Sequence, residues 1–207
     1  MTNLPEAAFR RFDESSDALF YRQPRLVNHI EDATIAGVTQ LYRELLPSGG
    51  VILDLMSSWV SHLPPEMTFS RVAGLGMNEQ ELGANPRLTD FAVHNLNQDP
   101  QLPYGNAEFD AAVCCVSVQY LTQPVAVMRE VARVLRPGAP FIITFSNRCF
   151  PTKAVMAWQQ LDDNGHLQLV AAYLREAGWE DVQMLNRTAP RAPEPLLAVV
   201  AHRPAAL

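Results

Sequence analysis

Several features are scarce in this chain, and each scarcity excludes a class of protein. Glycine accounts for 10 of 207 residues, below its usual share of about 7%, although glycine-rich loops build many nucleotide-binding sites. No apolar run approaches the roughly 18 residues of a membrane-spanning helix, so we expect no membrane segment. Three cysteines, two of them adjacent at Cys114 and Cys115, do not provide a disulfide framework.

Charge is also sparse, and its sign is negative. Charged residues make up 18% of the chain and the formal net charge is −6, which argues against a broad nucleic-acid surface. The first residues lack the apolar core of a secretory signal, so we expect a cytoplasmic protein with reduced thiols. No Cys-x-x-Cys or histidine spacing supports a metal site, and we predict none. The sequence does not fix the oligomeric state.

What is present is enough apolar material for a core, because 48% of residues are hydrophobic. Residues 24–46 have a helical apolar period, with Pro24 suited to the first turn and Pro47 ending the pattern. The period then changes to short apolar runs separated by helical stretches. We predict strands over 51–55, 71–75, 88–93, 109–116, 141–145, 179–185 and 196–201, and further helices over 79–82, 123–135, 152–161 and 164–177.

Apolar strands that do not alternate, with helices between them, indicate a parallel sheet covered on both faces. A short Pro-rich loop joins the last two strands and permits an antiparallel pair. We therefore predict an α/β fold with a three-layer, Rossmann-like sheet, mostly parallel with an antiparallel last strand. Residues 1–48 are expected to form an N-terminal helical cap or lid, and residues 49–207 one compact domain. Ligands should bind at the carboxyl ends of the strands.

Two blocks in the second half carry a family resemblance. The segment FDAAVCCVSVQYL (109–121) follows a Leu-Pro-aromatic triplet at 102–104, and VMREVARVLRPGAPFIITF (127–145) joins a helix, a Pro-Gly turn and a strand. With the order of elements, these blocks resemble the class I S-adenosylmethionine (SAM)-dependent methyltransferases, most closely the small type 11 group, over roughly residues 49–202. The resemblance implies a Rossmann-like methyltransferase sheet that binds SAM.

The first motif departs from that family. The family has Asp-x-Gly-x-Gly-x-Gly after its first strand, whereas this chain has VILDLMSSWVS at 51–61. Asp54 matches the acidic residue, and Met56, Ser58 and Val60 stand where glycines are expected. Glycines there allow a positive φ and a close approach of the backbone to the cofactor, so the altered residues require another loop path.

The second and third motifs depart as well. The family places an acidic residue at the end of its second strand to bind the ribose hydroxyls, and the aligned residue here is Gly76. Asn78 or Glu79 could replace that acid only if its side chain turned back toward the end of the strand. The acid often found near the adenine amino group aligns with Asn95 or Asn97.

The resemblance nevertheless implies a set of cofactor-binding residues. Asp54 would hold the methionine amino group, the turn at Met56, Ser57 and Ser58 would face the carboxylate, and Gly76 and Met77 would lie against ribose and adenine. The adenine edge and the wall of the pocket would come from Asn95, Leu96, Asn97, Cys115 and Val116. The alternatives are that Met77 and the cysteines belong to the core and that Asn97 stabilises a turn.

Two regions supply candidate residues for the methyl acceptor. Tyr21, Arg25 and His29 are predicted on or just before the first helix, with Arg25 and His29 on one face. Arg25 could clamp a carboxylate and His29 could act as a base. The alternative is an exposed, salt-linked helix face.

The loop after the fifth strand is the second region. Arg148 directly follows an apolar strand end, and His166 at the start of the next helix could join it. The alternative is helix capping by Thr152 or Asn164 beside a solvated arginine.

Three functions follow from these observations. The first is a SAM-dependent methyltransferase acting on a small polar or anionic metabolite, with no membrane partner. An RNA substrate is disfavoured by the negative charge and the lack of a basic tract. The second is a degenerate methyltransferase fold that serves as a regulator or scaffold binding SAM or S-adenosylhomocysteine. A nucleotide-dependent oxidoreductase is disfavoured, because no Gly-x-Gly-x-x-Gly follows the first strand.

Overall fold

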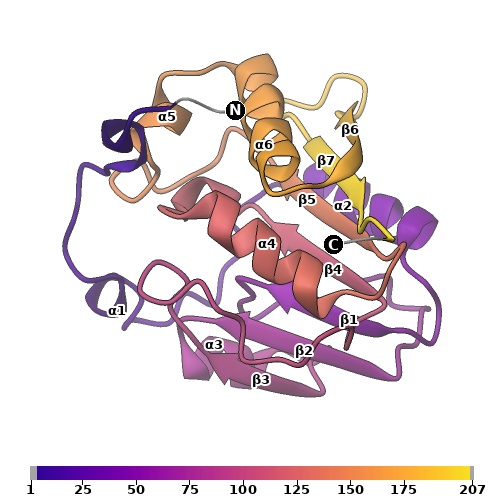
Figure 1. Cartoon of the computed structure of the whole chain (residues 1–207). Coiled ribbons are helices and arrows are strands. Elements are labelled where there is room, and N and C mark those ends of the chain that lie inside the picture. Colours follow the sequence, from indigo (N-terminus) through magenta and orange to yellow (C-terminus); the bar gives the residue numbers. More distant parts are fainter. Residues whose placement is uncertain (1–3, 206–207) are drawn as a thin grey trace.

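The computed structural model describes residues 4–205, in which a seven-stranded sheet is covered by helices on both faces (Figure 1). Its strands lie close to the predicted ranges, because most of them are apolar runs that the sheet buries. They are β1 (Val51–Leu55), β2 (Arg71–Gly76), β3 (Asp90–Val93), β4 (Ala111–Cys115), β5 (Pro140–Phe145), β6 (Glu180–Asn186) and β7 (Leu197–His202). The edge strands β3 and β6 are more exposed.

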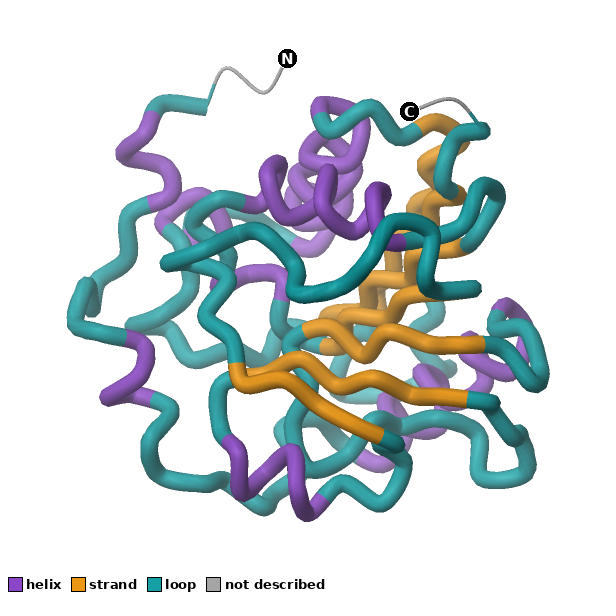
Figure 2. Tube along the Cα trace, turned by 60° about the horizontal axis from the view of Figure 1, so that its bottom comes forward, coloured by secondary structure: helices purple, strands orange, loops and turns teal. Residues whose placement is uncertain are grey.

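The strand order β3-β2-β1-β4-β5-β7-β6 confirms the predicted sheet. Neighbours from β3 to β5 pair in parallel, whereas β7 is antiparallel to both β5 and β6. Figure 2 shows the strands as one twisted sheet whose connecting loops gather at its ends. Because β1 lies between β2 and β4, the order of connections reverses beside it, which is where an open α/β sheet forms its ligand crevice.

Helices form the two outer layers. Six α-helices and two 3₁₀ turns are present among the described residues: η1 (Glu6–Phe9), α1 (Asp17–Phe20), α2 (Asp32–Leu45), α3 (Glu79–Ala84), η2 (Val118–Tyr120), α4 (Pro124–Val134), α5 (Met156–Gln159) and α6 (Asp163–Glu176). α4 begins with Pro124 in its first turn, where the missing N–H is not needed. The chain then turns at Gly138, whose φ is +78°, into β5.

Alternate residues of each central strand face opposite cores. On β1, Leu53 packs with α4 and α6, whereas Ile52 packs with α2 through Val38 and Leu41. The strands are therefore apolar on both faces, which explains why their sequences do not alternate.

Two helical predictions need correction. The helix predicted over 24–46 begins at Asp32, because the preceding segment is held by tertiary contacts; Glu194, for example, accepts a hydrogen bond from the Glu31 N–H at 2.7 Å. The helix predicted over 152–161 is reduced to α5, and residues 151–154 form a turn. The backbone of this region instead bonds to distant parts of the chain: the Met156 N–H donates to the Arg10 carbonyl.

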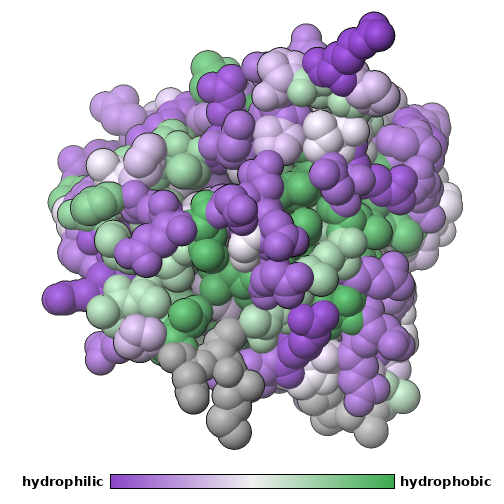
Figure 3. All heavy atoms as spheres, turned by 90° about the horizontal axis from the view of Figure 1, so that it is seen from above, coloured by the Kyte–Doolittle hydropathy of each residue, from purple (hydrophilic) through white to green (hydrophobic). Residues whose placement is uncertain are grey.

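The predicted cap at 1–48 divides into two parts in space. Residues 4–20 run down the left side of Figure 1 to α1, past the carboxyl ends of the parallel strands, whereas α2 packs into the second core. Between residues 4 and 205 no helix is long and apolar enough to cross a membrane. The face seen from above in Figure 3 is mainly hydrophilic, with apolar side chains showing between polar ones, as is common on protein surfaces.

Candidate functional site

A cleft of about 270 Å³ lies at the carboxyl ends of β1, β2 and β4 and under residues 11–30. The structure brings together most of the residues that the sequence analysis selected. All eleven predicted cofactor residues line this cleft: Asp54, Met56, Ser57, Ser58, Gly76, Met77, Asn95, Leu96, Asn97, Cys115 and Val116. The candidate acceptor residues Tyr21, Arg25, His29 and Arg148 line it too.

Asp54 is a buried carboxyl group at the end of β1. Its Oδ2 accepts hydrogen bonds from the hydroxyls of Ser57 and Ser61, each at 2.6 Å. Burial raises the pKa of Asp54 to about 6, against the opposing effect of the two serine hydrogen bonds. Both hydroxyls use the same oxygen, so Oδ1 is the atom left to accept from a ligand. Ser61 was not among the residues predicted from the sequence.

The loop after β1 explains the lost glycines. Met56 keeps the positive φ of a glycine position, at +57°, and Ser57 N–H then bonds to the Leu75 carbonyl at 2.8 Å, alongside β2. A Cβ at Gly76 would lie 2.3 Å from the Ser57 carbonyl oxygen, closer than atoms can approach. The unusual first motif therefore crosses the end of β2, and it is the reason that this strand ends in glycine.

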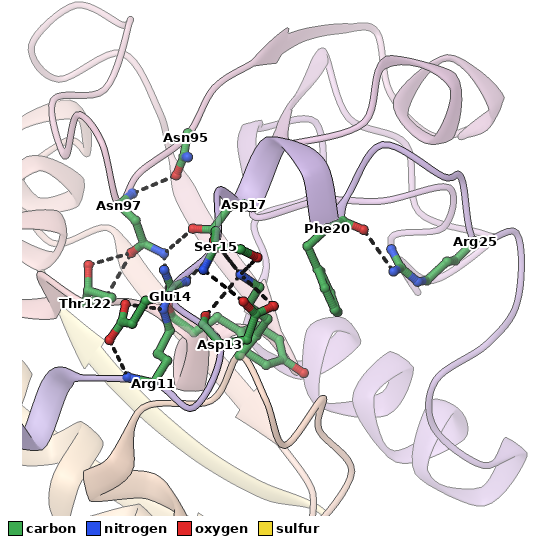
Figure 4. Close-up of polar contacts among 12 residues, drawn as sticks. Arg11, Asp13, Glu14, Ser15, Asp17, Phe20, Arg25, Asn95, Asn97 and Thr122 are labelled. Carbon is green, nitrogen blue, oxygen red and sulfur yellow. Dashed lines mark hydrogen bonds and ion pairs between the residues drawn. The ribbon is translucent and has the colours of Figure 1, made fainter.

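The loop after β3 is braced rather than free, as Figure 4 shows. The side-chain amide of Asn97 donates to Asp17 Oδ2 and to the Tyr120 carbonyl, both at 3.0 Å. Its oxygen accepts from the N–H and the hydroxyl of Thr122 at 2.8 and 3.1 Å, and Asn95 closes the turn by accepting from the Asn97 N–H. The side-chain oxygen of Asn97 is therefore engaged in stabilising the turn, which is the alternative role considered for this residue.

Arg25 reaches the cleft from a loop and not from a helix, so the predicted helix face shared with His29 does not exist. The backbone N–H of Arg25 donates to Glu81 Oε1 at 2.7 Å. The Val27 carbonyl accepts from the Trp59 indole N–H at 3.0 Å. These contacts to other parts of the fold hold the segment in an irregular, non-helical path, where its apolar spacing predicted a helix.

The Arg25 guanidinium lies among aromatic rings, 4.6 Å from the ring centroid of Phe20 and 5.3 Å from that of Phe150. It donates to the Phe20 carbonyl at 2.9 Å (Figure 4). The other arginines of the cleft have acidic partners, since Arg11 pairs with Asp17 and Arg148 with Glu31. Within residues 4–205, Arg25 has no carboxylate at salt-bridge distance.

Of the two histidines predicted for the acceptor site, His29 lines the cleft and His166 does not. The His29 ring meets Phe150 edge-on at 5.3 Å, and burial is the main cause that lowers its pKa. His166 lies outside the cleft: its ring stacks on Trp158 at 3.9 Å, and Nε2 pairs with the Trp158 carbonyl. The expectation that His166 joins Arg148 is corrected, because α6 turns this residue toward the core.

Glu81 is the main residue of the cleft that the sequence analysis missed. It is 8% exposed, and its Oε2 accepts from the Ser58 hydroxyl at 2.7 Å. A signal was present, because Asn78 and Glu81 have the spacing of a capping box. Asn78 does cap α3, but Glu81 turns away from the helix and into the cleft. Within residues 4–205, no group of three metal-ligating side chains is present.

Comparison with known proteins supports the fold assignment. Residues 60–143 match the model of a methyltransferase domain family. Over 99 residues, 46% of this chain, the sequence is 30% identical to a sterol 4-C-methyltransferase (strm-1) of Caenorhabditis elegans. That alignment spans 27% of the length of the curated relative.

Solved structures show the same architecture. A chain from the complex of the Haloferax volcanii Trm112 methyltransferase activator with a methyltransferase has a TM-score of 0.65 and 16% identity, over 85% of this chain and 92% of that one. A SAM-dependent methyltransferase from Mesorhizobium loti has a TM-score of 0.59 and 17% identity, over 81% and 98% of the two chains.

Proposed function

We propose that this chain, which has the fold of the class I SAM-dependent methyltransferases, binds SAM in the cleft and methylates a small polar or anionic metabolite. The observation that carries the proposal is the convergence of the predicted cofactor residues on one cleft at the carboxyl ends of β1, β2 and β4. Fold alone does not establish function, so the groups that line the cleft must account for the binding of SAM and the acceptor.

Asp54 fits the cationic end of the cofactor. It is a buried carboxylate with one oxygen left to accept from a ligand, and an ammonium group would offset the cost of its burial. The turn at Met56 and Ser57 lies beside it and lines the same cleft. SAM supplies a sulfonium-bound methyl group that is already electrophilic.

Arg25 fits an anionic group on the acceptor. It lacks an acidic partner among the described residues, and the aromatic faces of Phe20 and Phe150 hold its guanidinium in place. A planar guanidinium can bind a carboxylate or phosphate through two parallel hydrogen bonds. His29 is on the same cleft with a lowered pKa, so its ring is neutral at pH 7 and able to accept a proton from the acceptor.

The alternative is a SAM- or S-adenosylhomocysteine-binding regulator or scaffold without catalysis. One observation favours it: the Ser57 carbonyl occupies the space over Gly76 at the end of β2. A binder and an enzyme share the cofactor site, and they differ only in whether an acceptor is methylated.

Calorimetric titration with SAM, S-adenosylhomocysteine and NAD(H) tests the cofactor, and radiolabelled methyl transfer into a metabolite extract tests the enzyme. We expect the adenosyl ligands to bind, NAD(H) not to bind, and an anionic product to be labelled. Arg25→Met should abolish labelling while sparing S-adenosylhomocysteine binding, and Arg22→Met, an exposed neighbour outside the cleft, is the matched control. Binding without labelling would favour the regulator, and no adenosyl binding would refute both.

A further inference from the structure

The cleft is lined by three carboxylates, and one of them lacks a role. Among the residues that line it, Asp17, Asp54 and Glu81 are the acids. Asp17 pairs with Arg11 and Lys153 and accepts from Asn97, so its charge is compensated within the protein. Asp54 belongs to the proposed ammonium site. Glu81 is left as a buried acid.

The donors that meet Glu81 are neutral. Its Oε1 accepts from the backbone N–H of Arg25, and its Oε2 accepts from the Ser58 hydroxyl, each at 2.7 Å. Each carboxylate oxygen has two lone pairs, so both can accept from a further donor. A hydroxyl such as that of Ser58 can also rotate away when a ligand hydroxyl takes its place. A buried charge with only neutral partners is costly, and a ligand that donates to it would recover part of that cost.

The position of Glu81 is fixed by its helix. Asn78 at the N-cap of α3 accepts from the N–H groups of Gln80 and Glu81, and its amide donates to the carbonyls of Tyr21 and Arg22. The cap therefore ties α3 to the segment over the cleft. This places the Glu81 carboxylate between that segment and the loop after β1.

Glu81 lies on α3, the helix that follows β2, and the last residue of β2 cannot carry an acid. Any side chain at Gly76 would meet the Ser57 carbonyl oxygen at 2.3 Å. A ligand at the end of β2 must therefore find its acceptor on another element. A vicinal diol presents two O–H donors, and an acidic side chain in this part of an open α/β sheet is suited to accept them.

We propose that Glu81 binds the ribose hydroxyls of the adenosyl ligand, supplying from α3 the carboxylate that β2 cannot hold. This inference rests on the proposed function, because it assumes that an adenosyl ligand enters the cleft. It predicts a direct pairing between one side chain and one group of the ligand, and such a pairing can be tested by removing each partner in turn.

The experiment measures dissociation constants for S-adenosylhomocysteine and for its 2′-deoxy and 3′-deoxy ribose analogues by calorimetry. In the wild-type protein, removing a hydroxyl that bonds to a charged group should weaken binding about tenfold or more. Glu81→Gln should weaken binding of the parent ligand by a similar factor and should reduce the penalty for the missing hydroxyl to about twofold or less.

Glu79→Gln is the matched control, because Glu79 is exposed on the same helix and does not line the cleft. It should keep the wild-type affinity and the wild-type penalty. A Glu81→Gln protein that binds S-adenosylhomocysteine but keeps the full deoxy penalty would overturn the ribose assignment and leave the proposed function standing. Failure of the wild-type protein to bind any adenosyl ligand would overturn both.

Discussion

Asp54 carries the largest electrostatic cost among the residues proposed to bind ligand. The unfolded chain exposes this carboxyl, with an ordinary pKa of 3.8, whereas burial in the fold raises the pKa to about 6. The folded state therefore holds the proton more tightly than the unfolded state. Its stabilising contribution is complete below pH 4 and is lost as the pH rises toward 6.

The first prediction concerns the stability of Asp54→Asn. The pKa of Asp54 is raised by roughly two units, so at about pH 7.5 its burial as a carboxylate should lower the free energy of unfolding of the wild-type protein by up to about 3 kcal/mol. Asn removes the charge, so the variant should be more stable than wild type at about pH 7.5 and show little gain near pH 4. Urea unfolding at both pH values measures this, with exposed Asp163→Asn as the control. Equal gains at both pH values would contradict the assigned cause.

Gly76 is constrained by a backbone atom, which a small change in a neighbouring side chain cannot relieve. We predict that Gly76→Ala lowers the free energy of unfolding by about 1–3 kcal/mol, the usual cost of overpacking, and weakens S-adenosylhomocysteine binding by displacing Ser57. Gly83→Ala on α3 is the control, since nothing lies within 4 Å of its added Cβ, and it should gain up to about 1 kcal/mol. Similar stability of the two variants would show that the loop moves freely.

Residue types and spacing predicted which side chains line the cleft better than they predicted what those side chains do. Asp54 was identifiable because it matches the acidic residue of the family's first motif and lies within the buried strand β1, and that position does not depend on the loop beyond the strand. Asn97 and His166 were different, since a residue's hydrogen-bond partners and the face it turns to a core depend on remote residues such as Thr122 and Trp158. One sequence carries no signal for such pairings.

At the scale of elements, the segment over the cleft is fastened by a buried cation. Lys153, which is fully buried, donates to the carbonyls of Asp13 and Ser15 at 3.1 and 2.6 Å and lies 3.3 Å from Asp17 Oδ1. Asp17 also pairs with Arg11 at 2.7 Å. The turn after β5 and residues 11–17 are thus joined by ion pairs that are largely buried, so solvent screens them only weakly.

We predict that Lys153→Met lowers the free energy of unfolding by about 3 kcal/mol or more, because it leaves the carbonyls of Asp13 and Ser15 without their donor and removes one of the two cations that pair with Asp17. The loss should be local, so protease cleavage within residues 10–20 should increase while the sheet stays intact. Arg175→Met, at an exposed position near the end of α6, is the control and should change neither measurement. Unchanged cleavage in Lys153→Met would show that other contacts hold the segment.

Elements with a strong apolar period were predictable, whereas segments held by single polar contacts were not. β1, β2, β4, β5 and β7 were located as buried apolar runs, whereas β3 and β6 are more exposed strands at the edges of the sheet. α4 and α6 were located from their helical spacing. The irregular path of residues 22–31 depends on hydrogen bonds to three distant residues, Glu81, Trp59 and Glu194. Their contribution outweighs a weak helical propensity, and nothing within the segment indicates it.

At the scale of the whole molecule, stability should be distributed unevenly. Buried strands of a central sheet open only with global unfolding, whereas exposed segments fastened by a few polar contacts open locally. The sheet has two buried faces, while residues 11–30 contribute several exposed apolar side chains, such as Leu19 and Leu26. The cleft therefore lies between the rigid strand ends of the sheet and the segment 11–30, whose local opening ligand binding can reduce.

The last prediction follows from that arrangement and is measured by hydrogen exchange. S-adenosylhomocysteine should slow exchange most in residues 11–31 and 54–62, which line the cleft on loops, and least in β4 and β5, which are already protected. A ligand that binds only the folded state also raises global stability by mass action, so the local excess over the sheet is the informative quantity. NAD(H) at the same concentration is the control. Uniform slowing across the chain would mean that the cover is already ordered, and slowing confined to residues outside the cleft would place the ligand elsewhere.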